Sequence, residues 1–372
     1  MTFTIRAVQT APISLTADPD LTVHGAKGAH DRSDFLLVRV VATNPAGREI
    51  TGYGEVSATP LWSGEDGTTA AHLIRTVLTP VLVGMALGPV GAAEAAMDRV
   101  LAASPFTKAG VATALWDAWA RVLDVPLAVA LGGPYRTEVP IKLSLSGDGD
   151  VLDTVYRAAR TAGFGAFKVK VGLGVDGDLA RVARARELVG PDTFLGVDAN
   201  GGWSRAEAAR AVAGLAPYDV AFVEQPVAAT DLEGLRAIRQ LGVTVIADES
   251  VFDLADLVRV VQADAADVAS VYIGKAGGPG RAVRLAQVAS AFGIRSLLGS
   301  NGELGIGAAA QLHAACAIPD LATDLPSDII GAHYYTDDIL AEPLDSNGST
   351  VRLTDRPGLG VTPRPDLLDR FS

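Results

Sequence analysis

Cysteine, long apolar runs and basic charge are all scarce in this sequence of 372 residues. Cys316 is the only cysteine, so no disulfide can form within the chain, and such cysteine usage suits a reducing cytoplasm. The most apolar stretch, residues 111–131, is interrupted by three charged residues and a proline, so we expect no transmembrane helix. The N-terminus has no charged region followed by an apolar run, and we expect no signal peptide.

Acidic residues outnumber basic ones by 43 to 31, which gives a formal net charge of −12. An acidic surface repels nucleic acid and anionic lipid, so neither is an expected partner. Apolar residues make up 49% of the chain, which is enough to bury a sizeable core in one large or two ordinary domains. The composition is that of an ordered globular protein, and by itself it does not separate an enzyme from a binding protein.

The chain up to about residue 132 mixes strand and helix patterns. Residues 35–41 and 50–54 are strand-like and flank the turn Asn44-Pro45-Ala46-Gly47, which predicts a β-hairpin. Helical patterns follow at residues 68–78, 91–101 and 111–122. The last of these segments is almost entirely apolar, so it should be buried.

From residue 139 onward, short apolar runs alternate with helical segments. We expect strands at residues 140–145, 166–171, 194–197, 220–223, 244–247, 269–273, 295–298 and 321–325. Two capping boxes, Ser204 with Glu207 and Thr230 with Glu233, mark the start of intervening helices. This number of βα units favours a TIM-like α/β barrel over a doubly wound sheet, and no Gly-x-Gly-x-x-Gly motif follows the first strand. The tail from about residue 330 has no further βα unit and should pack back on the N-terminal region.

Five consecutive strands of this barrel end in residues that can move protons or bind a metal. In chain order, the strand ends supply Lys168 with Lys170, then Asp198, Glu224, Asp248 and Lys275. Subtracting successive residue numbers from Lys170 onward gives spacings of 28, 26, 24 and 27, about the length of one βα unit. Catalytic residues of such barrels lie at the C-terminal ends of the strands, so three carboxylates with a lysine on each side should share one cavity mouth.

Three adjacent carboxylates repel one another unless a cation joins them. Oxygen ligands favour a hard ion, so we expect Mg²⁺ at Asp198, Glu224 and Asp248, with Mn²⁺ as an alternative. A bound Mg²⁺ can hold a substrate carboxylate and stabilise the enediolate that forms when the α-proton leaves. Lys170 acts as a base only with a depressed pKa, which repulsion from Lys168 and from the nearby metal would favour. The simpler alternative is that these residues form ordinary salt bridges at the top of the barrel.

Together these motifs resemble the enolase superfamily, and within it the muconate lactonising enzyme subgroup. The resemblance covers nearly the whole chain and includes Gly54-Glu55, Ala114-Leu115-Trp116-Asp117, Leu131-Gly132-Gly133, the Lys-x-Lys strand, the Asp/Glu/Asp set and Lys275-Ala276-Gly277-Gly278. It implies that Asp198, Glu224 and Asp248 bind the metal and that Lys170 and Lys275 are the acid/base pair.

The resemblance also implies an architecture. The expected fold is a modified TIM barrel, (β/α)7β, at residues 133–329, with an α+β capping domain at residues 1–132. Residues 330–372 should fold back on that capping domain, and the protein should form a homo-oligomer. Related enzymes carry specificity loops on the capping domain, at about residues 23–33 and 57–66 here. Trp62 and Tyr53 are the candidate substrate contacts from that domain, with ordinary interdomain packing as an equal alternative.

Further polar residues are expected around the proposed metal ligands. Asn200, Gln225 and Glu249 follow directly after three of the strands and should hydrogen-bond to the ligands rather than bind the metal. Asn200 is also a candidate substrate contact. Glu303 lies in the segment 300–307, which resembles the strand-seven motif of muconate cycloisomerases, and it is a candidate substrate contact without an assigned role.

Three positions bear on which relatives the chain resembles most. Many relatives have a lysine where this chain has Tyr272. Dipeptide epimerases grip the substrate ammonium with Asp-x-Asp near strand eight, whereas Asp324-Leu325-Pro326 keeps only the first Asp, which counts against a dipeptide. The mandelate racemase subgroup uses a histidine–aspartate dyad, but here strand six offers lysine, and we expect His313 to be helical and not catalytic.

These features favour an isomerase, that is, a cycloisomerase, racemase or epimerase acting on a small carboxylate. A syn-dehydratase using the same lysines is the alternative enzyme class, and loss of water from the substrate would identify it. A non-catalytic binding protein on the same scaffold is a third possibility, but it does not require lysines on both strand two and strand six.

Overall fold

The computed structural model describes residues 2–21, 24–26, 28–29 and 32–372. The N-terminal unit contains an antiparallel sheet of three strands in the order β1 (Thr4–Thr16), β4 (Arg32–Thr43) and β5 (Glu49–Val56). A separate pair is formed by two short strands, β2 (His24–Gly25) and β3 (Gly28–Ala29). The Asn44 carboxamide accepts hydrogen bonds from the N–H groups of Ala46 and Arg48. This closes the turn between β4 and β5 and confirms the predicted hairpin.

Helices cover one face of this sheet. They are α1 (Pro60–Ser63), α2 (Gly67–Leu73), the π-helical turn η1 (Ile74–Leu78), α3 (Thr79–Leu82), α4 (Val90–Val100), α5 (Pro105–Leu123) and α6 (Leu127–Ala130). The buried helix α5 lies directly against β5 because Gly54 has no side chain: a Cβ there would lie 2.0 Å from the backbone oxygen of Gly110. The glycine at position 54 therefore sets how closely helix and sheet approach.

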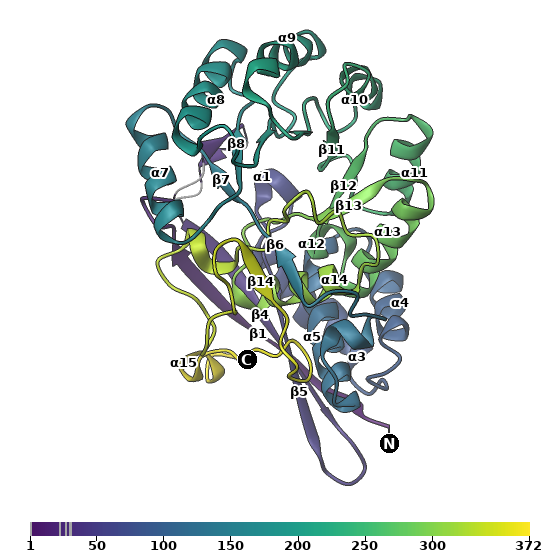
Figure 1. The fold of residues 1–372 in the computed structure, drawn as a ribbon. Helices are drawn as coiled ribbons and strands as arrows, with labels where there is room; N and C mark the ends of the chain where they lie inside the picture. Colours follow the sequence, from purple (N-terminus) through teal and green to yellow (C-terminus); the bar gives the residue numbers. More distant parts are fainter. Residues whose placement is uncertain (1, 22–23, 27, 30–31) are drawn as a thin grey trace.

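The second unit is a parallel sheet in which seven strands are hydrogen-bonded in chain order. The strands are β7 (Leu143–Leu145), β8 (Phe167–Lys170), β9 (Leu195–Asp198), β10 (Val223–Glu224), β11 (Val245–Ala247), β12 (Val268–Val271) and β13 (Arg295–Leu298). The intervening helices are α7 (Asp150–Thr161), α8 (Val175–Val189), α9 (Arg205–Leu215) with η2 (Ala216–Tyr218), α10 (Leu232–Arg239), α11 (Leu254–Gln262), α12 (Ile273–Ala276), α13 (Pro279–Ala291) and α14 (Gly305–Ala317). Figure 1 shows the strands enclosed by these helices, with the antiparallel sheet on one side of the ring.

The ring is closed by residues 321–327. Parallel bridges join Ser296 to Leu321 and Ile141 to Ser327, which link β13 back to the start of the first barrel strand. The eighth strand expected at residues 321–325 is therefore present only as isolated bridges. Pro326 has no N–H to donate, so a regular ladder cannot run through this segment.

The C-terminal segment returns to the N-terminal sheet. It contains η3 (Gly331–Tyr334), β14 (Thr350–Arg352), which pairs with β6 (Glu138–Pro140), and α15 (Pro365–Leu368). Ser372 and Thr10 exchange two backbone hydrogen bonds, and the Arg39 guanidinium lies 4.6 Å from the centre of the Phe371 ring. Figure 1 shows both chain ends on the same side of the molecule. The exact limits of the capping and barrel domains stay a prediction.

One of the two predicted capping boxes is confirmed and the other is wrong. Ser204 and Glu207 exchange both reciprocal hydrogen bonds at the start of α9. At α10 the capping residue is Asp231 and not Thr230, because the Asp231 carboxylate accepts from the N–H of Gly234. The carboxylate is a stronger acceptor than a hydroxyl and also pairs with Arg205.

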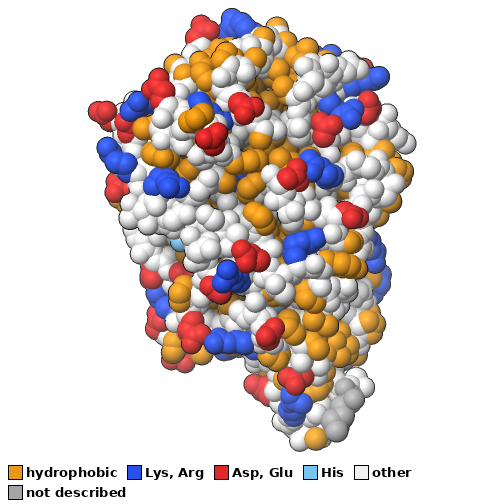
Figure 2. All heavy atoms as spheres, in the orientation of Figure 1, with side chains coloured by type: hydrophobic (Ala, Val, Ile, Leu, Met, Phe, Trp, Pro, Cys, Tyr) orange, Lys and Arg blue, Asp and Glu red, His pale blue; other side chains and the backbone are white. Residues whose placement is uncertain are grey.

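Charged side chains of both signs lie on the surface of the molecule (Figure 2). Figure 2 shows acidic and basic side chains interspersed on the visible face, so the excess of acid forms no single large patch there. Within the described ranges, no helix combines the length and the apolar character needed to cross a membrane.

His313 lies on α14 and is buried, as expected for a structural residue. Its Nδ1 accepts a hydrogen bond from the N–H of Ala128, and its Nε2 lies 3.1 Å from the carbonyl oxygen of Leu359. Burial lowers the pKa of His313 to about 4. The neutral ring therefore links α14 to α6 and to the C-terminal segment.

We expect a His313→Gln variant to resist acid better than the wild type. The unfolded state binds a proton at His313 below its ordinary pKa of 6.5, whereas the folded state does so only near 4, so wild-type stability falls as the pH drops through that window. Gln can keep both hydrogen bonds without titrating. Between pH 7 and pH 4.5, the free energy of unfolding of the wild type should fall by roughly 2–3 kcal/mol more than that of the variant. The free energies of unfolding would be measured by urea titration at both pH values. An equal decrease for the wild type and the variant would show that His313 does not cause the acid sensitivity.

Candidate active site

The strand register brings the predicted site residues to one end of the barrel. Lys170 of β8 is paired in register with Asp198 of β9, and Asp198 with Glu224 of β10. Asp248 follows β11 directly. Lys275 lies in the one-turn helix α12, and not on strand six, because β12 ends at Val271. The five side chains nevertheless occupy one cluster, in the predicted order.

Lysines of β8 bind two of the three carboxylates. The Lys170 ammonium lies 2.7 Å from Oδ2 of Asp198 and 3.0 Å from the carboxamide oxygen of Asn200. The Lys168 ammonium lies 2.9 Å from Oε2 of Glu224 and 3.4 Å from Oδ2 of Asp198. The Asn200 amide group donates to Glu249, so Asn200 links Lys170 to the acidic residue after Asp248.

The third carboxylate is held from the other side of the cluster. The Lys275 ammonium lies 2.6 Å from Oδ1 of Asp248 and also donates to the carbonyl oxygens of Asp248 and Ser270. The Tyr272 hydroxyl donates to Oδ2 of Asp248 at 2.8 Å, and its ring centre lies 4.0 Å from the Lys275 ammonium. Tyr272 therefore fixes both partners of this buried ion pair.

The charges of the cluster shift the pKa values of its members strongly. Burial opposes ionisation of Asp198, yet Lys170 and Lys168 hold its pKa at about 2. Burial raises the pKa of Glu224 to about 7, and the neighbouring carboxylates add to this effect against the attraction of Lys168. Burial alone would lower the pKa of Lys170, but Asp198 raises it above its ordinary value. Repulsion from Lys168 lowers the pKa of Lys170, as expected, but the attraction to Asp198 outweighs this repulsion while the two residues form an ion pair.

The donor set fits a hard divalent cation. Asp198, Glu224 and Asp248 offer only oxygen atoms, and Oε1 of Glu224 is buried without a hydrogen-bond partner. Such an orphaned carboxylate oxygen is costly unless a cation or water completes it. Within the described part of the chain, no three acidic, imidazole or thiol groups already converge as a metal site, and each of these carboxylates forms an ion pair with a lysine. Binding a cation would require these ion pairs to part.

A cavity of about 120 Å³ opens beside the cluster. Lys168, Lys170 and Asn200 line it, and so does Trp62 of the capping domain, whose role as a substrate contact stays a prediction. Trp62 stacks on Tyr272 with ring centres 5.3 Å apart and planes 7° apart, and on Phe252 at 5.5 Å. The remaining lining residues are Ala17, Leu21, Gly25, Ser144, Tyr272, Ser300, Asn301, Gly302, Asp328, Ile330, Tyr334 and Tyr335. The expected loop at residues 23–33 lies partly outside the described residues, Val23 included.

Two predicted substrate contacts lie elsewhere. Tyr53 points away from the cavity: its ring lies 6.1 Å from that of Phe371, which fits the packing alternative. Glu303 is buried behind the cavity, where its carboxylate accepts from Ser300, Asn301 and Gln311. Glu303 therefore shapes the loop that lines the cavity but does not line it. The predicted role of Gln225 as a supporting residue is consistent with its bonds to Ser250 and to the N–H of Asp248.

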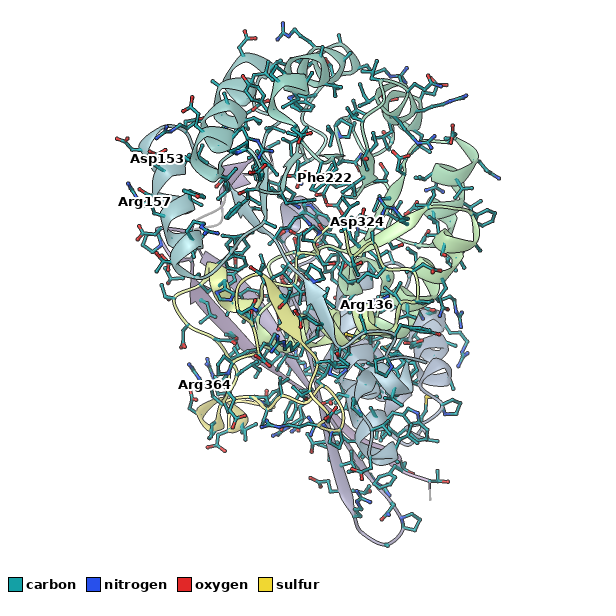
Figure 3. The ribbon with its side chains drawn as sticks, viewed as in Figure 1. Arg136, Asp153, Arg157, Phe222, Asp324 and Arg364 are labelled. Atoms are coloured by element: carbon teal, nitrogen blue, oxygen red, sulfur yellow. The ribbon has the colours of Figure 1, made fainter. Side chains whose placement is uncertain are left out.

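Asp328, not Asp324, is the acid at the end of strand eight. Asp324, which is labelled in Figure 3, is exposed and pairs with Arg295. Asp328 lines the cavity and binds both Lys142 and Lys168. Asp328 could have been found by looking for a charged residue just after the eighth strand, as was done for the other strands. Lys142 could have been recognised as a lysine within an otherwise apolar barrel strand.

The comparisons with known proteins agree with this geometry. Residues 13–132 match the mandelate racemase / muconate lactonizing enzyme N-terminal domain, and residues 150–367 match the enolase C-terminal domain-like family. The chain belongs to the muconate lactonizing enzyme subgroup of the enolase superfamily. As its relatives are cycloisomerases, racemases and epimerases, it is an enzyme of that superfamily.

Similarity to members of the superfamily extends over most of the chain. It is 33% identical to muconate cycloisomerase 1 of Rhodococcus opacus over 90% of this chain and 91% of the relative. It is 34% identical to the hydrophobic dipeptide epimerase of Enterococcus faecalis over 78% of this chain and 82% of the relative. The crystal structure of muconate lactonizing enzyme from Pseudomonas fluorescens, complexed with muconolactone, has a TM-score of 0.90 at 27% identity and covers 98% of both chains.

Superfamily motifs outside the cavity have structural roles in this chain. The Glu55 carboxylate accepts from the N–H groups of Leu304 and Gly307, which ties β5 to the start of α14. Asp117 accepts from the N–H groups of Tyr53 and Leu359. These two buried acids connect the capping domain to the barrel and to the C-terminal segment.

Proposed function

We propose that this enzyme is a Mg²⁺-dependent isomerase that moves the α-proton of a small carboxylate. The observation that carries the proposal is the placement of two lysines at opposite edges of one carboxylate cluster. Lys170 binds Asp198 and Lys275 binds Asp248, and three strands, β9 to β11, separate β8 from β12. Two such groups can reach the two faces of one α-carbon, which racemisation and epimerisation require.

The chain's own residues would divide the work. The Nζ atoms of Lys170 and Lys275 would hold or accept the α-proton, one on each face of the substrate. Lys170 would accept it only once its ion pair with Asp198 has parted, because that ion pair raises the pKa of Lys170. Lys168, which contacts both Asp198 and Glu224, would keep the carboxylates in place and would not itself move the proton. The aromatic wall of Trp62 and Tyr272 would exclude water from the Lys275 side.

The metal ligands in this proposal are Asp198, Glu224 and Asp248. Mg²⁺ bound there would neutralise the carboxylate group of the substrate and the charge that develops on it when the α-proton leaves. The unpartnered Oε1 of Glu224 and the all-oxygen donor set support this assignment. Mn²⁺ could replace Mg²⁺ with the same ligands.

A screen in D₂O with Mg²⁺ tests the proposal. The relatives' names point to muconates, N-succinylated arginine and lysine, and dipeptides as substrates of those proteins, so these carboxylates and other acylamino acids form the panel. Proton NMR should show loss of the α-proton signal from at least one compound without loss of water. Loss of water instead would identify the syn-dehydratase alternative. Binding of a panel compound with no exchange and no product would favour the binding-protein alternative.

A further inference from the structure

Tyr272 contacts both partners of the buried ion pair between Asp248 and Lys275, and it does so with two different parts of its side chain. The hydroxyl donates to Oδ2 of Asp248 at 2.8 Å, while the ring centre lies 4.0 Å from the Lys275 ammonium. The side chains of Asp248 and Lys275 are each 1% exposed, and Tyr272 is 4% exposed. One buried residue therefore touches a proposed metal ligand and a proposed acid/base group at the same time.

The ring of Tyr272 has supports of its own, which do not involve the hydroxyl. On the capping-domain side, the Trp62 ring lies parallel to it, with planes 7° apart and centres 5.3 Å apart. On the barrel side, Gly299 directly after β13 leaves room for the ring, since a Cβ there would lie 2.0 Å from Cε1 of Tyr272. A phenylalanine at position 272 would keep both supports.

The two contacts of Tyr272 differ in what a bound metal would do to them. Oδ1 of Asp248 accepts from Lys275, and a divalent cation on Asp248 would repel that ammonium. The nearest remaining contacts of the ammonium would be the carbonyl oxygens of Asp248 and Ser270 and the ring of Tyr272. An aromatic face attracts an ammonium whether or not the carboxylate stays beside it. The neutral hydroxyl, in contrast, can go on donating to Asp248 while the carboxylate binds the metal.

We propose that Tyr272 is a positioning residue with two separable tasks. Its hydroxyl orients the Asp248 carboxylate for the metal, and its ring holds the Lys275 ammonium at one face of the substrate after the ion pair has parted. This inference rests on the proposed function and adds a residue to it. Removing a hydrogen-bond partner of a metal ligand typically lowers metal affinity by about 10–100-fold. Misplacing an acid/base group by about 1 Å can lower the rate by about 10²-fold.

Tyr272→Phe and Tyr272→Leu separate the two tasks. Both variants lack the hydroxyl, so calorimetric titration of the metal-free proteins with Mg²⁺ should give a Kd about 10–100-fold above that of the wild type for each. At saturating Mg²⁺, only the leucine variant should lose deuterium exchange with the enantiomer that depends on Lys275, by about 10–100-fold. Exchange with the enantiomer that depends on Lys170 should stay at the wild-type rate in both variants, whereas a general structural defect would lower both exchange rates together.

Each task can be refuted by itself. An unchanged Mg²⁺ Kd in Tyr272→Phe overturns the role of the hydroxyl. Equal exchange rates in the phenylalanine and leucine variants, or exchange that depends on Lys275 for neither enantiomer, overturn the role of the ring. Absence of α-proton exchange in the wild type on the whole panel would instead refute the proposed function and the role of the ring with it. The Mg²⁺ titration needs no substrate, so it decides the role of the hydroxyl in that case too.

Two further variants complete the test. Tyr156→Leu is the control, because Tyr156 lies on α7, packs against Phe167 and is not among the described residues that line the cavity. It should keep the wild-type Mg²⁺ Kd and both exchange rates. If Tyr272→Leu does not fold, Gly299→Ala takes its place, because the added Cβ displaces the Tyr272 ring without removing it. Gly299→Ala should lose the same exchange, and an unchanged rate in it overturns the role of the ring.

Discussion

Replacing either Lys170 or Lys275 by methionine should lower turnover by about 10²–10⁴-fold, which is the usual effect of removing a general acid or base. Methionine keeps the length of the side chain but cannot carry a proton. Because the two lysines bind different carboxylates at opposite edges of the cluster, we expect each variant to lose exchange with one enantiomer only. Lys170→Met should still exchange the α-proton that faces Lys275, and the reverse should hold for Lys275→Met.

The measurement is enantiomer-resolved deuterium incorporation in D₂O. A matched control is Lys108→Met, since Lys108 is also a buried lysine in an ion pair, with Asp98, but lies on α5 outside the cavity. Its exchange rates should equal those of the wild type. If one lysine variant exchanges both enantiomers normally, the chemistry is one-sided, as in a cycloisomerase or syn-dehydratase. Full activity of both variants would refute the acid–base assignment.

Weakening the proposed metal site should reduce α-proton exchange as strongly as replacing a lysine does. Glu224→Gln removes the carboxylate between Asp198 and Asp248, so we expect Mg²⁺ binding to weaken at least about tenfold and α-proton exchange to disappear. Mg²⁺ at a hundredfold excess over its Kd should raise the free energy of unfolding of the wild type by about 2.7 kcal/mol. With at least tenfold weaker binding, the variant should gain no more than about 1.4 kcal/mol at the same concentration.

Glu303→Gln is the control for the metal experiment. Glu303 is also a buried acid close to the cavity, but it bonds to Ser300 and Gln311 and lies outside the lysine–carboxylate cluster. It should retain both Mg²⁺ affinity and stabilisation by Mg²⁺. Equal stabilisation of Glu224→Gln and the wild type would show that the proposed ligands do not bind the ion.

Much of the architecture could be predicted from periodicity. Alternating βα segments predicted the parallel barrel, and regular spacing placed Lys170, Asp198 and Glu224 in adjacent register because one βα unit has a nearly constant length. The helix cap at Asp231 and the irregular eighth strand were missed, since these depend on competition between neighbouring side chains and on a single proline. The homo-oligomer stays a prediction from the resemblance.

The candidate site was only partly predictable. Strand ends indicated which residues meet, but the ion pairs that each carboxylate forms depend on side-chain orientation, which spacing does not specify. For this reason the raised pKa of Lys170 was not expected. Tyr53 and Glu303 were predicted as substrate contacts from their positions in the sequence. In the structure, Tyr53 packs against Phe371 and the Glu303 carboxylate accepts a hydrogen bond from Ser300. Asp328 and Lys142 were missed because their contact joins the first and last strands of the closed ring.

The central claim, metal-assisted movement of an α-proton, is tested most directly by deuterium incorporation into the substrate of the intact enzyme. The rate should be measured in D₂O with Mg²⁺, with EDTA, and with Mg²⁺ restored. We predict deuterium at the α-carbon with Mg²⁺, its loss with EDTA and its recovery when Mg²⁺ returns, because the carboxylate cluster supplies the ligands and the two lysines supply the proton path. Turnover of the true substrate with no deuterium at the α-carbon, or exchange unaffected by EDTA, would contradict this account.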